Sequence, residues 1–231
     1  MKNISGSDLA KKNAAEKACE LVSDGMVVGL GTGSTIAHAI RLLGRRVQDE
    51  GLDIVGVPTS YSTEALAIEC GIPLTSLAAS PGLDIAIDGA DQVDASLNAI
   101  KGGGAAHTRE KIVSCSAQQF IIVADDKKLS NMLDRSVPVE VIPYARNLVE
   151  RELIRLGGTC AIRTGTGKDG PTISDNGNFI LDCSFGQIKE PALLGEKMSR
   201  IPGLVEHGIF TNAVMVYVGY ENRVEVLRRK V

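Results

Sequence analysis

The segment Lys101–Glu110 (KGGGAAHTRE) brings together residue types that proton transfer requires. A lysine stands directly before three consecutive glycines, and a glutamate lies nine residues after that lysine. Three glycines in a row lose much backbone entropy on folding, so they are expected where the backbone must approach a ligand closely. A carboxylate can act as a general base, and an ammonium can stabilise a developing oxyanion. The glycines could bring Lys101 and Glu110 around one ligand, with Glu110 near the start of a helix that Thr108 is expected to cap. A surface turn with a capping glutamate is the alternative, and it would be preferred for such a loop taken alone.

A second acidic segment, Asp88–Asp94 (DGADQVD), follows an apolar stretch and carries three carboxylates. Asp88 and Asp91 could face the hydroxyl groups of a ligand or exchange protons with them. A metal site and a solvated helix cap are the alternatives. The spacing of an EF-hand loop is absent, and no histidine or further acidic cluster lies nearby in the sequence, which disfavours a metal.

The glycine-rich segment Gly29–Thr35 (GLGTGST) lies between a predicted strand and a predicted helix. Backbone N–H groups in such a loop can bind an anion, and the hydroxyl groups of Thr32, Ser34 and Thr35 would add donors. The lysine of a phosphate-binding GK[ST] motif and the third glycine of a dinucleotide fingerprint are both missing. A tight turn capped by threonine or serine explains the segment equally well.

Other catalytic chemistry is not indicated by the sequence. It contains no Ser/His/Asp elbow and no HExxH segment, and the histidines lie in unrelated segments, so we expect them to be structural: His38, His107 and His207. The cysteines are odd in number, far apart and without CxxC spacing. We expect free thiols that behave as small core residues in a reducing compartment: Cys19, Cys70, Cys115, Cys160 and Cys183.

Short, continuously apolar segments alternate with helical ones in the first half of the chain. The expected strands are 26–30, 53–57, 83–87 and 120–123, and the expected helices are 9–23, 35–43, one that runs through Cys70, and 108–117. This alternation predicts a parallel sheet with helices on both faces. Ligands bind such sheets at the carboxyl ends of the strands, where GTGST, PTS, DGAD and ADDKK all lie.

The sequence changes character near Val137-Pro138. A strand, a helix, two strands, a helix and a further strand are expected in this order: 137–143, 144–156, 161–163, 179–182, 191–200 and 204–210. This order is typical of a ferredoxin-like unit. We therefore predict a main domain of residues 1–136 and 211–231, with an inserted small αβ domain of residues 137–210. A last strand at 213–218 is expected to rejoin the main sheet.

The composition is that of a globular protein and sets limits on its partners. The chain has 231 residues, 44% hydrophobic and 23% charged, with a net charge of −3. No block of lysine or arginine stands apart, which argues against nucleic acid as a partner. The first residues lack the apolar core of a signal peptide, and no apolar run approaches the ~20 residues of a membrane span. A cytoplasmic location without membrane association is the expectation.

Taken in order, these segments resemble the type A ribose-5-phosphate isomerases. The matching blocks cover nearly the whole chain: GTGST, PTS, DGADQVD, KGGGAAHTREKI, VADDKKL, VPVEVIP, SDNGNFILD and VEHGIF. The resemblance implies a Rossmann-like main domain with an inserted αβ domain, and a homodimer or homotetramer without metal or cofactor. It also implies the interconversion of ribose 5-phosphate and ribulose 5-phosphate through a cis-enediolate, in the non-oxidative pentose phosphate pathway.

The resemblance assigns roles by matching position. Glu110 would be the proton acceptor, with Asp88, Asp91 and Lys101 as the other catalytic residues. The implied substrate-binding residues are Lys11, Thr32, Gly33, Ser34, Thr35, Asp88, Gly89, Ala90, Asp91, Lys101, Gly102, Gly103, Gly104 and Lys128. Two points stay open, namely which of Asp88 or Asp91 opens the sugar ring and whether Lys127 or Lys128 contacts substrate. A non-catalytic sugar-phosphate sensor or an NAD-linked oxidoreductase would lack this combination of base, lysine and acidic loop.

Overall fold

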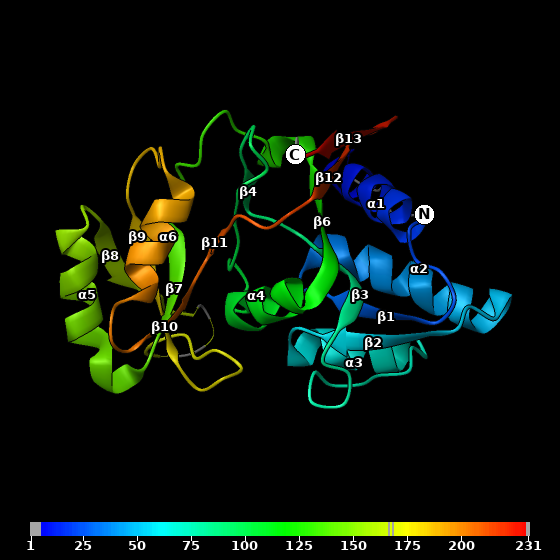
Figure 1. The fold of residues 1–231 in the computed structure, drawn as a ribbon, viewed down its shortest axis with the longest axis horizontal. Helices are drawn as coiled ribbons and strands as arrows, with labels where there is room; N and C mark the ends of the chain where they lie inside the picture. Colours follow the sequence, from blue (N-terminus) through cyan, green and yellow to red (C-terminus); the bar gives the residue numbers. More distant parts are fainter. Residues whose placement is uncertain (1–5, 166, 168, 230–231) are drawn as a thin grey trace. The chain divides into compact units, whose positions relative to one another are not determined.

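The computed structural model describes residues 6–165, 167 and 169–229 (Figure 1). Two compact units make up the described chain. The first comprises the described parts of Met1–Ala90, Arg109–Leu129 and Asn212–Val231, and the second comprises the described parts of Asp91–Thr108 and Ser130–Thr211. Residues 91–108, 130–136 and 211 thus group with the second unit, whereas the sequence-based division put them in the main domain. Residues 166 and 168 of the predicted turn region, and both chain ends of the predicted main domain, lie outside the described residues.

The first unit is built on a six-stranded sheet in the order β13-β12-β6-β3-β1-β2. Its strands are β1 (Met26–Leu30), β2 (Ile54–Pro58), β3 (Leu83–Asp88), β6 (Ala117–Asp125), β12 (Met215–Gly219) and β13 (Val224–Arg228). All neighbouring pairs are parallel except β12 and β13. The predicted Rossmann-like sheet is confirmed, and so is the return of the last predicted strand to it. The antiparallel edge strand β13 was not predicted, because its residues are mostly exposed and give no buried apolar run.

Helices cover both faces of this sheet. Val28 and Leu30 of β1 pack into one apolar cluster with α1 (Gly6–Cys19) and α2 (Ser34–Glu50). Gly29 lies between them and therefore points to the opposite face. A Cβ atom at position 29 would lie 2.5 Å from the side chain of Val113, so α4 (His107–Ser116) packs closely on that face. Among the described residues, none of the helices is long and apolar enough to cross a bilayer.

Helix α2 is longer than predicted. The sequence predicted a helix from about Thr35 to Leu43, yet the helix continues to Glu50 and ends at Gly51, whose φ is +75°. A Cβ atom at Gly44 would lie 2.5 Å from the carbonyl oxygen of Cys70, which follows α3 (Tyr61–Glu69). Gly44 therefore allows α2 to pack against the end of α3 and does not stop the helix.

The second unit contains a four-stranded antiparallel sheet in the order β10-β7-β9-β8. Along the chain its elements are β7 (Val137–Val141), α5 (Arg146–Arg155), β8 (Thr159–Ile162), β9 (Phe179–Ser184), α6 (Pro191–Ser199) and β10 (Leu204–His207). The described residues also include the short 3₁₀ helices Asp126–Lys128 in the first unit and Pro143–Ala145 in the second. The β-α-β-β-α-β order and this strand arrangement are those of a ferredoxin-like unit, which confirms the predicted fold class.

A small three-stranded sheet in the second unit was not predicted. It has the order β11-β5-β4 and consists of β4 (Gln92–Val93), β5 (Ala99–Ile100) and β11 (Ile209–Phe210). The single strand expected at 204–210 is divided between the two sheets at Gly208. A Cβ atom at Gly208 would lie 2.2 Å from the carbonyl oxygen of Lys101, so this crossing requires a glycine.

The expectation of five free thiols is wrong for two cysteines. Cys160 on β8 and Cys183 on β9 are directly opposite each other and form a disulfide, with their Cα atoms 4.1 Å apart. Their separation of 23 residues gave no sign of this, because only the register of the two strands brings them together. Among the remaining thiols, burial raises the pKa of Cys19 to about 12, as expected for an inert core cysteine.

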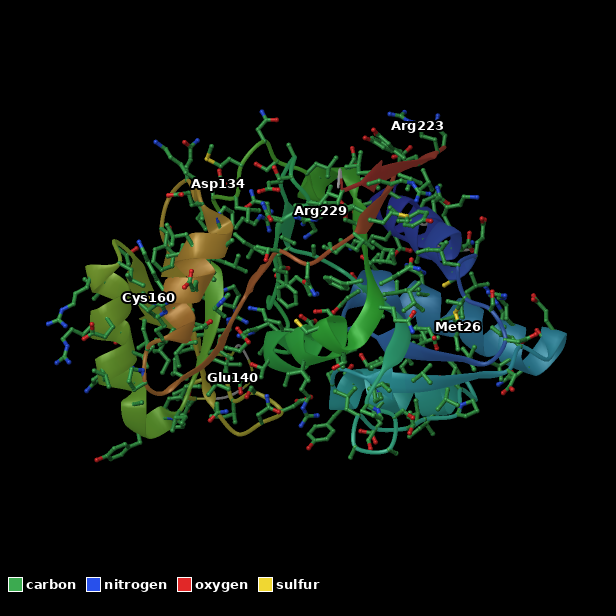
Figure 2. All side chains as sticks on the ribbon, viewed as in Figure 1. Met26, Asp134, Glu140, Cys160, Arg223 and Arg229 are labelled. Carbon is green, nitrogen blue, oxygen red and sulfur yellow. A yellow bond between two sulfur atoms is a disulfide. The ribbon has the colours of Figure 1, made fainter. Side chains whose placement is uncertain are left out.

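Glu140 is a fully buried carboxylate in the middle of β7 (Figure 2). It accepts hydrogen bonds from the hydroxyl of Thr108, from Ser174 Oγ at 2.7 Å, and from the side-chain amides of Asn178 and Asn176 at 2.8 and 3.1 Å. Thr108 thus lies inside the first turn of α4, and its hydroxyl binds Glu140. The prediction that Thr108 caps this helix is wrong.

These hydrogen bonds decide the ionisation state of Glu140. Burial by itself would raise the pKa of its carboxyl, but the donors from Thr108, Asn178, Ser174 and Asn176 outweigh burial and hold the pKa below its ordinary value. Each of these donors is neutral, so the carboxylate is stabilised by oriented dipoles. Through these hydrogen bonds the Glu140 carboxylate connects strand β7 to Thr108 and to the 174–178 turn.

We predict that Glu140→Gln lowers the free energy of unfolding at pH 7 by about 2–3 kcal/mol, since donors to a buried charge are lost. The folded-state pKa is depressed, so this stabilisation is present above the ordinary carboxyl pKa of about 4 and is lost as the pH falls through the folded-state value. Urea unfolding of both proteins at several pH values measures the difference. Glu196→Gln, at an exposed ion pair on α6, is the matched control and should change little. A difference for Glu140→Gln that does not shrink at low pH would contradict this account.

Candidate active site

In the first unit, the predicted site segments follow three adjacent parallel strands. The GTGST loop follows β1, the PTS segment runs on from the end of β2, and Asp88 ends β3. The strands pair in the order β3-β1-β2, so their carboxyl ends share one edge of the sheet. This edge is where open parallel sheets bind ligands.

The loop after β1 is fixed by a cluster of hydroxyl groups. The hydroxyl of Thr32 lies 2.8 Å from that of Thr59, 2.8 Å from that of Ser60 and 3.1 Å from that of Thr63. Thr63 also donates to the carbonyl of Gly31 at 2.7 Å. The Thr32 side chain is therefore engaged within the loop, and the start of α2 is the part of the segment that remains suited to bind an anion.

Asp88 is buried against this same loop. Its Oδ1 accepts hydrogen bonds from the backbone N–H groups of Thr32 at 3.1 Å and Gly89 at 2.7 Å. A Cβ atom at Gly31 would lie 2.1 Å from that oxygen, so position 31 must be glycine for the carboxylate to fit. The loop and the acidic segment were separate motifs in the sequence, and in the structure they form one arrangement.

The N-terminus of α2 has the features of an anion site. Its N-cap is Gly33, with φ at +119°, a conformation that favours glycine. The first N–H groups of a helix lack partners within it, and the helix dipole adds positive potential there. Lys11 of α1 brings a cation to this end, with its Nζ 3.2 Å from the hydroxyl of Ser34. The position of Lys11 therefore fits its predicted role.

The two adjacent lysines lie in the 3₁₀ helix Asp126–Lys128, directly after β6. Because β6 neighbours β3 in the parallel sheet, this turn begins at the same edge as Asp88. Lys127 is exposed, and its backbone N–H binds the Asp125 side chain at 3.1 Å, whereas Lys128 is partly buried. Which of the two lysines contacts the substrate stays a prediction.

Glu110 lies in the first turn of α4 and is buried. A carboxylate at this end of a helix is stabilised by the helix dipole. The preceding residue, Arg109, stacks on the ring of Tyr61 on α3, with its guanidinium carbon 4.7 Å from the ring centroid. Arg109 and Tyr61 were not singled out in the sequence. Their contact connects α4 to α3 within the first unit.

The second unit holds the other predicted site residues. Lys101 follows β5 and is buried, with its Nζ 5.4 Å from the ring centroid of Phe210. Asp91 precedes β4, and its Oδ2 accepts a hydrogen bond from the N–H of Gly103 at 2.8 Å. The third carboxylate of the acidic segment, Asp94, instead binds the backbone N–H groups of its own turn. Asp91 and the glycine loop therefore belong together, and Asp94 has a structural role.

Arg163 binds the other side of the glycine loop and was missed in the sequence. Its guanidinium contacts the carbonyl oxygens of Gly102 and Gly103 and the carboxylate of Asp182. A lone arginine after a short strand carries no motif, and the contact depends on the strand register.

Each unit thus carries one part of the predicted site. The first holds Asp88, Glu110, the GTGST loop, Lys11 and Lys128, and the second holds Asp91, Lys101 and Gly102–Gly104. Glu110 and Lys101 lie in different units, so their predicted meeting at one site stays a prediction. In the part of the chain that the structure describes, no three His, Cys, Asp or Glu side chains form a group that could hold a metal ion.

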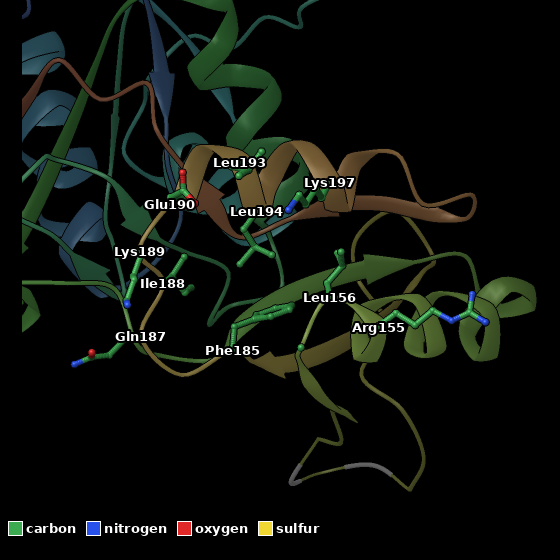
Figure 3. A pocket seen from close by; sticks show the side chains of 11 residues that line it. Arg155, Leu156, Phe185, Gln187, Ile188, Lys189, Glu190, Leu193, Leu194 and Lys197 are labelled. Atoms are coloured by element: carbon green, nitrogen blue, oxygen red, sulfur yellow. The ribbon is translucent and has the colours of Figure 1, made fainter.

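The second unit also contains a cavity of about 510 Å³ that involves none of the predicted site residues (Figure 3). Leu156, Phe185 and Leu194 contribute apolar lining, and Lys189 and Arg155 project away from one another at its ends. Ligand sites usually have polar groups that converge on the ligand. The cavity is therefore a weaker candidate for the active site than the loops at the carboxyl ends of the strands.

Comparison with known proteins agrees with this geometry. The family model described as ribose 5-phosphate isomerase A (phosphoriboisomerase A) matches residues 55–223. The ribose-5-phosphate isomerase A of Methanosarcina acetivorans is 58% identical over 218 residues, which cover 94% of this chain and 93% of that protein. That of Natronomonas pharaonis is 54% identical over 98% of this chain and 100% of its own.

Solved structures show the same fold. The ribose 5-phosphate isomerase A of Methanocaldococcus jannaschii superposes with a TM-score of 0.92 at 46% identity, covering 97% of this chain and 100% of that one. A D-ribose-5-phosphate isomerase in complex with phospho-erythronic acid superposes with a TM-score of 0.94 at 45% identity, with the same coverage. The chain therefore belongs to the ribose 5-phosphate isomerase A family.

Proposed function

We propose that this chain interconverts D-ribose 5-phosphate and D-ribulose 5-phosphate, an aldose–ketose isomerisation of the non-oxidative pentose phosphate pathway. Family membership over nearly the full chain is the observation that carries the proposal. The strand-end loops, the buried Glu110 and the buried Lys101 are side chains and backbone of the kinds that the reaction needs.

The phosphate group of the substrate would bind at the N-terminus of α2. Gly33, Ser34 and Thr35 would supply backbone and hydroxyl donors there. Lys11, which already contacts Ser34, would supply positive charge, and Lys128 would add more. Binding energy at the phosphate would orient the distant reacting carbons.

Glu110 would transfer the proton. Its carboxylate takes the proton from C2 of the open-chain aldose, the C1–C2 double bond forms, and the aldehyde oxygen O1 becomes the charged oxygen of a cis-enediolate. The same proton then returns to C1, and the O2 proton passes to O1, so that O2 becomes the ketone oxygen and O1 the hydroxyl of the product. Lys101 and the N–H groups of Gly102 and Gly104 would stabilise the negative charge on oxygen, while the N–H of Gly103 holds Asp91.

Ribose 5-phosphate is mainly a closed ring, so a proton must first move from the anomeric hydroxyl to the ring oxygen. Asp88 is our candidate, with Asp91 as the alternative. Two N–H groups hold Oδ1 of Asp88, and one N–H holds Oδ2 of Asp91. Each carboxylate is thus held in one orientation, and Gly89 and Ala90 between them would contact the sugar.

We also propose a cytoplasmic homodimer or homotetramer whose small-molecule partner is a sugar phosphate, with neither nucleic acid nor membrane as a partner. The net charge of −3 and the absence of a block of lysine or arginine in the sequence argue against nucleic acid as a partner. The Cys160–Cys183 disulfide is unusual for a cytosolic chain, although intracellular proteins of hyperthermophiles do contain disulfides.

We predict that Glu110→Gln lowers kcat by at least about 10²–10⁴, because the amide cannot accept the C2 proton. Substrate affinity should stay within a few-fold, since Glu110 makes no proposed contact with the phosphate. A coupled assay with ribose 5-phosphate measures the rate, and calorimetric titration measures binding. Glu69→Gln, at an exposed glutamate of α3, is the control. Near-normal turnover of Glu110→Gln would remove it from the mechanism.

For Lys101→Met we expect a loss of about 10²–10³ in kcat with a small change in KM, because the ammonium acts on charge that exists only in the transition state. Lys12→Met, on the surface of α1, should behave as wild type. If instead KM alone changes, Lys101 acts in ground-state binding.

Dialysis against EDTA should leave the activity unchanged. Lys101 and backbone N–H groups supply the positive charge that a metal would otherwise provide, so the proposed proton transfer needs none. The rate of the dialysed protein, with and without added Mg²⁺ or Zn²⁺, is the measurement. Loss of activity that a divalent ion restores would overturn the metal-free mechanism.

A further inference from the structure

Arg163 is bound on every side of its guanidinium group. Nε donates to Asp182 Oδ2 at 2.9 Å and one terminal nitrogen donates to Asp182 Oδ1 at 2.5 Å. The other terminal nitrogen donates to the carbonyl oxygens of Gly102 at 2.8 Å and Gly103 at 3.1 Å. The side chain is 17% exposed. The two hydrogen bonds to the Asp182 carboxylate therefore hold the arginine, and the arginine in turn holds two successive peptides of the glycine loop.

The two captured carbonyls determine where the neighbouring N–H groups point. The described peptide bonds are all trans, and in a trans peptide the C=O and N–H point in opposite directions. The Gly102 carbonyl faces Arg163, so the N–H of Gly103 faces away, where it binds Asp91 at 2.8 Å. The Gly103 carbonyl also faces Arg163, so the N–H of Gly104 points away from the guanidinium as well.

We infer that Arg163 is a positioning residue for the isomerisation, acting through Gly102–Gly104. It keeps two carbonyl oxygens turned away from the enediolate and so presents the N–H groups of the same peptides on the side of Asp91. Its charge also polarises these peptides and strengthens their N–H groups as donors. This inference rests on the proposed function, because it explains how the loop after Lys101 is held in the donor orientation.

The strand register fixes Arg163 at this place. Its backbone N–H donates to the carbonyl of Ile180 on β9 at 2.8 Å, and Asp182 lies on that strand. Asp182 is adjacent to Cys183, whose disulfide to Cys160 joins β9 to β8. The guanidinium therefore has a rigid support in the second unit, as a positioning group requires.

The test compares Arg163→Met with Arg155→Met, a control at an exposed arginine of α5 in the same unit. For Arg163→Met we expect kcat to fall by about 10–100-fold with KM within about threefold, as when one oxyanion donor is weakened. Inhibition by phospho-erythronic acid, whose carboxylate resembles the enediolate, should weaken by a similar factor. Inhibition by D-ribitol 5-phosphate, which has the hydroxyls and phosphate without a carboxylate, should change little.

This difference between the two inhibitors separates positioning from a structural role, which would weaken both. Added guanidinium chloride at millimolar concentration should restore part of the lost kcat of Arg163→Met and have no effect on Arg155→Met. If Arg163→Met does not fold, Arg163→Lys supplies the test. It keeps the charge and the pair with Asp182 but cannot bind both carbonyls, and we expect the same signature at smaller size.

Unchanged kcat in Arg163→Met or Arg163→Lys, or equal weakening of both inhibitors, would overturn the inference. These outcomes leave the proposed function intact. Failure of the proposed function would appear differently, as absence of ribose 5-phosphate isomerisation in the wild type and in Arg155→Met.

Discussion

The Asp88 carboxylate occupies the space that a side chain at position 31 would need, and the first unit's part of the site depends on this fit. The N–H of Thr32 binds the carboxylate, and the hydroxyl of Thr32 joins those of Thr59, Ser60 and Thr63. The carboxyl ends of three strands are thereby connected by polar contacts within one unit. The next residues of the loop begin α2, whose first N–H groups lack partners within the helix.

Two segments that carry proposed catalytic groups are each held by a charged side chain that takes no proposed part in the chemistry. Glu140 holds the first turn of α4, two residues before Glu110, through neutral donors. Arg163 holds the glycine loop after Lys101 through its carbonyls. A charge removed from water is costly unless it is hydrogen-bonded, and this requirement makes the arrangement around the buried Glu140 and the partly buried Arg163 specific in geometry. The two supports differ in one respect, because Arg163 has an ionic partner in Asp182 and Glu140 has dipoles.

The order of the elements and the strand-end loops could be predicted from sequence because continuous apolar runs, glycines and helical periodicity are local signals. Three features could not. Gly44 resembles a helix end and is instead a packing contact with Cys70, which only the tertiary structure shows. Thr108 resembles an N-cap, but its hydroxyl binds Glu140, which is distant in sequence. Cys160, Cys183 and Arg163 act through the register of β8 and β9, which is set by the whole second unit. The same holds for the candidate site. Its motif residues could be named from the sequence, whereas the side chains that hold them in place, Glu140 and Arg163, could not.

The cross-strand disulfide has a consequence for how the supports form. Cys160 and Cys183 close a covalent ring that contains Arg163 and Asp182 as well as Ser174, Asn176 and Asn178, the three donors to Glu140 that lie in one turn. Closing a ring of this size removes chain entropy from the unfolded state, which favours folding by about 3 kcal/mol. In the oxidised unfolded chain Asp182 and three of the donors to Glu140 are therefore already confined to one small volume, whereas the reduced chain must bring them together by diffusion.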